Sequence, residues 1–112
     1  MKNFIQEGDA LDLPAPYAVS SGGGALIGSL FGVAVADLAS GAVGTFNLEG
    51  VYTLPKATGA STGGAVGAKV YWIAASKTVT AVASGNSLIG AFAAVAADGD
   101  ATARVRLNGG TV

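Results

Sequence analysis

Short apolar runs recur along this chain, and Gly, Ser, Asn and Asp separate them. The clearest pattern lies in Thr45–Leu54, where the large apolar residues Phe46, Leu48, Tyr52 and Leu54 all occupy even-numbered positions. A period of two places such residues on one face of a β-strand. The pattern therefore predicts a half-buried strand over this range.

Two further features favour β-structure. Pro55 cannot donate a ladder hydrogen bond, so we expect it to end the first strand. Thr102–Leu107 repeats the alternation, with Arg104 and Arg106 on its outward face. The other expected strands are Phe4–Gln6, Ala25–Ile27, Leu30–Val35, Ala68–Ile73, Thr78–Val82, Ser87–Ala91 and Ala91–Ala97.

The segments between the expected strands are typical of turns and loops. We predict a tight hairpin at Ala74–Lys77 and turns at Ser84–Ser87 and Asp98–Asp100, because Gly and Asn accept positive φ at little cost. Ala57–Gly67 is expected to be a long surface loop that is mobile before assembly. Ala36–Ala42 is rich in Ala, the best helix former, but is so short that a helical turn is the most we expect.

The chain shows no repeat of fixed length and no shift in composition. Its 112 residues fit a single domain. We therefore predict one all-β domain over residues 1–112, a small single-domain β-barrel or β-sandwich with at most a short helical turn.

The composition favours assembly over catalysis. Although 51% of the residues are hydrophobic, most of these are Ala and Val, and the chain has only four Phe, three Tyr and one Trp. A core of small side chains buries little area, so oligomerisation should add stability that a monomer lacks. The chain has no His and no Cys, which rules out the usual catalytic triad and any disulfide. We predict no catalytic residues.

Charge is scarce and scattered. Six Lys and Arg and seven Asp and Glu give a net charge of −1. No basic patch for nucleic acid is therefore predicted. Acidic residues interrupt the N-terminus, so it is not a signal peptide, and Pro and Gly break the longer uncharged stretches, so no membrane span is predicted. We expect a soluble protein made in the cytoplasm.

Two candidate ligand sites fail on the requirements of their motifs. Gly63–Lys69 is Gly-rich like a phosphate loop, but its lysine does not directly follow a glycine and no Ser or Thr comes after it. Glu7, Asp9 and Asp12 lack the other oxygen ligands of a calcium loop, and we interpret them as a solvated turn before Leu13. No metal or cofactor is predicted.

Four side chains are candidates for contact with another protein. Tyr71 and Trp72 are neighbours on an expected strand and must face opposite sides, so we expect one in the core and the other in an interface, where aromatic residues are enriched. Arg104 and Arg106 share one face. They could meet an acidic partner, pair with the aspartates of the preceding turn, or form a solvated outer face.

Several segments, in their order along the chain, resemble a known family. These segments are Met1–Asp9, Leu30–Ala34, Glu49–Lys56, Gly67–Trp72, Leu88–Gly90 and Asp98–Gly109. The ordered set, rather than any single motif, resembles the capsid cement or decoration proteins of bacteriophages and prophages. The resemblance extends over nearly the whole chain.

The resemblance implies a β-rich, non-enzymatic protein that binds the major capsid protein on the outside of a phage head and stabilises the head. It also implies a homotrimer at a symmetry axis, and hence a location on the capsid exterior of the virion. Two other hypotheses remain. One is another virion module, at a tail or fibre base. The other is a nucleotide-dependent recombination protein, against which the incomplete phosphate loop argues.

Phe4, Ile5 and Gln6 complete the set of candidate capsid or subunit contacts. Apolar residues almost at the terminus suggest that residues 1–6 form an arm that orders only on the shell. An ordinary first strand of the barrel or sandwich fits the same residues equally well.

Overall fold

The computed structural model describes residues 10–108 of the chain. This part contains nine β-strands and no helix. The all-β class predicted from the sequence is confirmed. The strands are β1 (Ala10–Pro14), β2 (Gly24–Ile27), β3 (Leu30–Ala34), β4 (Val43–Asn47), β5 (Glu49–Pro55), β6 (Lys69–Ile73), β7 (Thr78–Thr80), β8 (Ser87–Phe92) and β9 (Thr102–Asn108).

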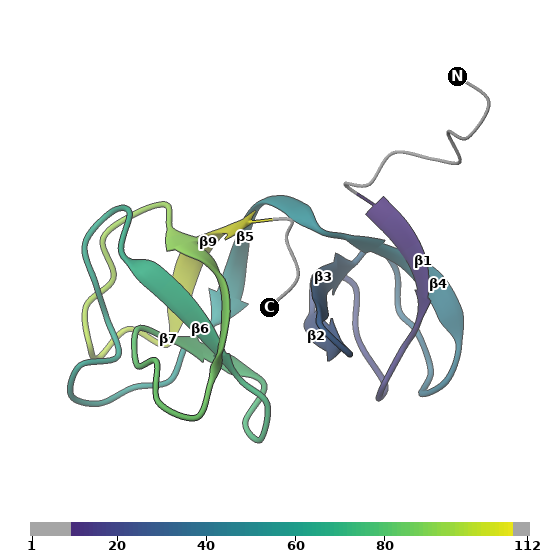
Figure 1. Cartoon of the computed structure of the whole chain (residues 1–112), viewed down its shortest axis with the longest axis horizontal. Helices are drawn as coiled ribbons and strands as arrows, with labels where there is room; N and C mark the ends of the chain where they lie inside the picture. The colour runs from purple at the N-terminus through teal and green to yellow at the C-terminus, as the bar shows by residue number, and fades with distance from the viewer. Residues whose placement is uncertain (1–9, 109–112) are drawn as a thin grey trace.

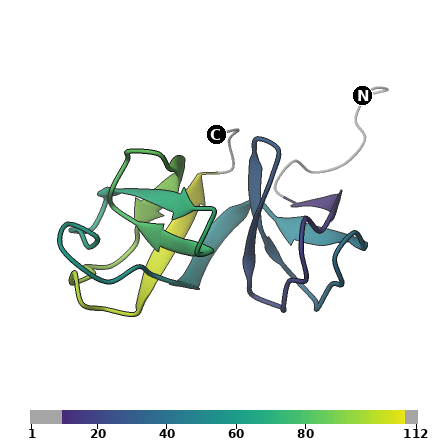
Figure 2. The same ribbon diagram turned by 90° about the horizontal axis from the view of Figure 1, so that it is seen from below.

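The strands form two sheets, one from each half of the chain (Figure 1). We call residues 10–48 the N-terminal half and residues 49–108 the C-terminal half. The first sheet has the order β1-β4-β3-β2, and the second has the order β5-β9-β8-β6-β7. Figure 2 shows the two halves side by side, joined where β4 leads into β5.

The two halves repeat one strand arrangement. Without β7, the order β5-β9-β8-β6 matches β1-β4-β3-β2 strand for strand. The long connections match as well. An isolated antiparallel bridge joins them in each half, Val19 with Leu38 in the first and Gly64 with Ala96 in the second. The described part of the chain is therefore a structural duplication.

Backbone hydrogen bonds define this correspondence residue by residue. The N–H of Gly22 donates to the Ala34 carbonyl (2.8 Å), and at the equivalent place the N–H of Gly67 donates to the Phe92 carbonyl (2.9 Å). The strand registers agree too. Equivalent pairs are Leu13–Gly44 with Leu54–Ala103, and Ala25–Gly32 with Val70–Gly90.

Equivalent residues of the two halves are not separated by a constant number of positions along the chain. The sequence pattern therefore does not reveal the duplication. A two-residue turn joins β2 to β3, whereas residues 74–86, including β7, separate β6 from β8. Leu13 therefore matches Leu54, while Ala34 matches Phe92, much further along the chain.

β7 gives the C-terminal half a barrel-like shape. It pairs with β6, and its Val79 forms a parallel bridge with Lys56, directly after β5. The N–H of Ala57 adds a hydrogen bond to the Val79 carbonyl (2.9 Å). The second sheet thus curls back towards its own first strand.

Within residues 10–48 nothing corresponds to β7. Pro16 stands at the position of Ala57 and has no N–H to offer an added strand. Instead, the Tyr17 hydroxyl donates to the Gly24 carbonyl on the edge strand β2 (2.7 Å). Burial raises the pKa of Tyr17, which keeps this donor protonated. In the N-terminal half the Tyr17 side chain therefore protects the sheet edge at β2. In the C-terminal half β7 covers the equivalent edge at β6.

Two clusters of buried apolar residues form the core. The larger lies mainly in the C-terminal half but includes Phe31 and Val33 of β3. Phe31 packs against Trp72, with ring centroids 4.8 Å apart and planes tilted by 56°. The smaller cluster surrounds Phe46 in the N-terminal half. The two halves therefore share the larger cluster.

The predicted strand Thr45–Leu54 is corrected to two strands in different sheets. β4 ends at Asn47 and β5 begins at Glu49, so Leu48 marks the change of sheet. Gly50 has a φ of +115°, a conformation open chiefly to glycine, which the alternating pattern does not disclose. The end of this strand at Pro55 is confirmed.

Two further expectations are wrong. Asp12 lies within β1 rather than in a solvated turn, because Leu11 and Leu13 flank it with the alternation of a strand and β1 pairs with β4. The strand expected over Ala91–Ala97 stops at Phe92. Beyond it, the N–H of Ala93 donates to the Arg104 carbonyl (2.8 Å), and Ala96 forms an isolated bridge with Gly64.

The hairpin and the turns expected in the second half are confirmed, as are the other expected strands within the described residues, apart from shifted ends. Ala36–Ala42 contains no helical turn. The expected strand Phe4–Gln6 lies outside the described residues.

Candidate functional site

Lys56 is buried, with 4% of its surface exposed, although it carries a charge. Its Nζ lies 2.7 Å from the Ala57 carbonyl, 3.0 Å from Thr62 Oγ1, 3.0 Å from the Asp98 carbonyl and 3.1 Å from the Asp100 carbonyl. An ammonium has three protons to donate, so these oxygens satisfy it fully. Lys56 therefore ties the end of β5 to the turn before β9 and acts as a structural clamp.

The Asp98 carboxylate strengthens the same connection. It accepts hydrogen bonds from the N–H of Gly63 (2.9 Å) and of Ser61 (3.2 Å). These two donors, Gly63 first, hold the pKa of Asp98 below its usual value. The loop Ala57–Gly67, which we expected to be mobile before assembly, is thus bonded at several points to the turn at residues 98–100.

The lowered pKa of Asp98 predicts an acid-sensitive connection. A carboxyl with a depressed folded-state pKa stabilises the fold above its unfolded-state pKa, near 3.8, and this contribution is lost as the pH falls through the folded-state pKa. We expect urea-unfolding midpoints of Asp98→Asn to depend less on pH below about 4 than those of the original protein. Glu49→Gln, which changes an exposed acid, is the control. Equal slopes for Asp98→Asn and the original protein would contradict the assignment.

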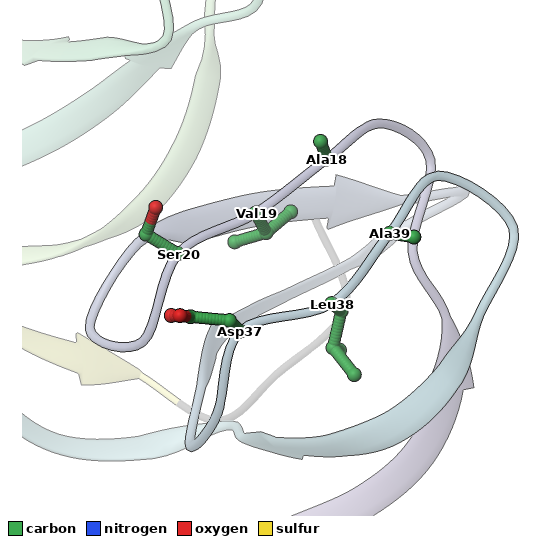
Figure 3. A pocket seen from close by; sticks show the side chains of 6 residues that line it. All are labelled: Ala18, Val19, Ser20, Asp37, Leu38 and Ala39. Carbon is green, nitrogen blue, oxygen red and sulfur yellow. The ribbon is translucent and has the colours of Figure 1, made fainter.

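A shallow hollow of about 330 Å³ lies at the connections of the N-terminal half (Figure 3). Figure 3 shows Ser20 and Asp37 at one end and Ala39 at the other. Its lining residues are Ala18, Val19, Ser20, Asp37, Leu38 and Ala39. Ser20 and Asp37 are its two polar side chains, and the Asp37 carboxylate accepts a hydrogen bond from the N–H of Ser21 (2.8 Å). Across residues 10–108 no group of three acidic side chains is placed to hold a metal ion.

Valines are exposed on both halves, and two of them mark a difference between equivalent places. Val66 and Val95 flank the Gly64–Ala96 bridge and are 63% and 73% exposed. Their counterparts in the N-terminal half are polar, since the N–H of Ser21 donates to the Asp37 carboxylate there (2.8 Å). Val43, Val51 and Val35 are exposed elsewhere. Single exposed apolar residues are common on protein surfaces, so the pair beside the Gly64–Ala96 bridge is the more informative feature.

The structure separates the candidate contact residues. Trp72 is buried against Phe31, whereas Tyr71 is half-buried and keeps some surface for a partner. Arg104 and Arg106 are exposed on the outward face of β9. They do not pair with the aspartates of the preceding turn, whose carboxylates accept backbone N–H groups instead. Phe4, Ile5 and Gln6 lie outside the described residues.

The sequence pattern missed Lys56 and its network. A single lysine after Leu-Pro carries no signal of burial, because its four acceptors come from three separate places in the chain. Only the paired connections of the duplicated fold bring them together.

Comparison with protein families matches residues 5–107 of the chain to the phage cement protein family. Comparison with curated proteins and with solved structures gives no match. No helix of the described chain is long and apolar enough to span a membrane. Because the family match covers almost all of the chain, this protein belongs to the phage cement proteins and has a structural role in a phage capsid.

Proposed function

We propose that this protein binds the outer surface of a phage head as a homotrimer and stabilises the head without catalysing a reaction. The family match over residues 5–107 carries the proposal. The exposed valines on both halves support it, because a cement protein needs contact surface on more than one side. Symmetry repeats each modest contact many times over the shell, so the contacts act together.

Binding to undecorated heads tests this proposal. Heads assembled from the matching major capsid protein are mixed with increasing amounts of the full chain, pelleted and imaged by electron cryo-microscopy. We expect saturable binding and extra density on the outside of the shell, in groups of three. Failure to pellet with heads would contradict the proposal, and density confined to the tail vertex would favour the alternative virion module.

Removal of residues 1–6 tests the proposed arm. We expect the shortened protein to remain a folded trimer but to lose head binding, because Phe4 and Ile5 would supply apolar contact to the shell. The matched control replaces Lys2 and Asn3 with alanine and keeps the apolar pair. The measurements are light scattering and pelleting with heads. Head binding that survives the deletion would rule out the arm.

A further inference from the structure

Three basic side chains gather on the outward face of the C-terminal sheet. Arg104 and Arg106 extend from β9, and Lys69 extends from β6; all three are exposed. The strand register places two of them in one row, since Arg106 pairs with Ala91 on β8 and Ala91 pairs with Lys69. Strands in a sheet lie about 4.8 Å apart, so this row puts the backbones of the two residues about 10 Å from each other. We call Lys69, Arg104 and Arg106 the basic strip.

No acidic side chain of residues 10–108 forms an ion pair with the basic strip. The Asp98 carboxylate accepts the N–H groups of Ser61 and Gly63, and the Asp100 carboxylate accepts that of Ala97. By register the nearest acid is Glu49, which pairs with Asn108 in the row beyond Arg106, and no ion pair joins it to the strip. Within the described chain the strip is therefore open to an external anion or carboxylate.

The duplicated fold does not require this charge. The residues at the equivalent positions of the N-terminal half are Gly24, Thr45 and Asn47, all uncharged. That half carries an acid instead, because Asp12 on β1 stands at the position of Thr53 on β5. Equivalent faces of the two halves thus differ in charge, which indicates a role for the strip beyond folding.

The chain itself contains a complementary segment. Glu7, Asp9 and Asp12 are three of its seven acidic residues and lie within six positions of one another. Asp12 is exposed on β1, which Figure 1 shows at the end of the molecule away from the C-terminal half. β1 and the strands of the basic strip belong to different halves of the chain. Opposite charges on different parts of one chain favour head-to-tail contact between copies, and such a contact makes a closed ring when its rotation fits.

We propose that the acidic segment of one copy, residues 7–12, docks on the basic strip of the next copy and defines the head-to-tail contact of the homotrimer. This inference rests on the homotrimer proposed above. Exposed charge pairs set orientation and association rate more than affinity, so neighbouring apolar residues such as the exposed Val51 would supply contact area. The contact should weaken with salt, because the screening length is about 10 Å at 0.1 M.

A charge-swap series on the full chain tests this inference. The first variant is Arg104→Glu with Arg106→Glu, the second is Glu7→Lys with Asp9→Lys, and the third combines all four substitutions. Light scattering and sedimentation at low salt give the mass. We expect a trimer for the original protein, at least a ~10-fold higher dissociation concentration for each charge reversal, and a restored trimer for the combined variant. Circular dichroism should show that every variant is folded, because the changed side chains described by the structure are exposed.

A control distinguishes the strip from a general change of charge. Ala74→Glu with Ala75→Glu adds two negative charges on the exposed β6–β7 turn and should leave the trimer intact. Reversal of the strip that leaves the trimer intact would overturn the inference, as would an original protein that is monomeric at every concentration tested. If the reversed strip keeps the trimer but loses head binding, the strip faces the shell. The inference then fails while the proposed function stands.

Discussion

Replacement of Trp72 by alanine is expected to lower the free energy of unfolding by about 3–5 kcal/mol, the usual cost of removing a large buried aromatic side chain. Trp72 is 3% exposed and packs against Phe31 from the other half of the chain. Gly24 leaves room for this pair, since a Cβ there would lie 2.6 Å from the Phe31 ring and 3.3 Å from Trp72. The substitution therefore leaves a cavity where the two halves pack against each other.

Urea unfolding followed by circular dichroism measures the loss. Tyr71→Ala is the matched control, because Tyr71 is the half-buried neighbour on the same strand and should cost less. Trp72→Phe keeps an aromatic ring against Phe31 and should fall between the two. We also expect Trp72→Ala to unfold in a broader transition, since the halves lose their shared contact. A loss below about 1 kcal/mol for Trp72→Ala would contradict the packing described here.

Replacement of Lys56 by methionine is expected to cost about 3 kcal/mol, within the range for breaking a buried charged network. Methionine fills a similar volume but donates nothing. The carbonyls of Ala57, Asp98 and Asp100 would then lose the donor that they share. Replacing a buried ion pair with apolar residues can be neutral, but here three of the four acceptors are backbone carbonyls, which remain after the substitution.

The matched control is Lys77→Met on the β6–β7 turn. Lys77 is exposed, and its Nζ lies 4.6 Å from the centroid of the Tyr17 ring, so its loss should cost at most about 1 kcal/mol. Thermal and urea unfolding of both variants give the comparison. Equal stability of Lys56→Met and the original protein would show that water or other donors can replace the ammonium.

The sequence predicted the individual strands better than it predicted which sheet each strand joins. Alternation in Thr102–Leu107 correctly placed Ala103, Val105 and Leu107 inside and the two arginines outside, because a period of two depends only on local geometry. The change of sheet at Leu48 was missed, since alternation continues through it.

Sequence patterns did not predict the duplication or the Lys56 clamp, for related reasons. Equivalent residues such as Ala15 and Lys56 differ in size and charge, although both are buried. The two halves agree in hydrogen bonding rather than in side chains. For the candidate contact residues, the pattern predicted the exposure of Arg104 and Arg106 and the burial of one of the neighbours Tyr71 and Trp72. Which partner they meet depends on charges elsewhere in the assembly.

Head stability tests the central claim most directly. Undecorated heads are saturated with the purified protein, and the fraction of intact heads is counted by electron microscopy after heating in steps. The account predicts that decorated heads rupture at a higher temperature than bare heads. Identical rupture temperatures for bare heads and heads saturated with the protein would contradict the stabilising role.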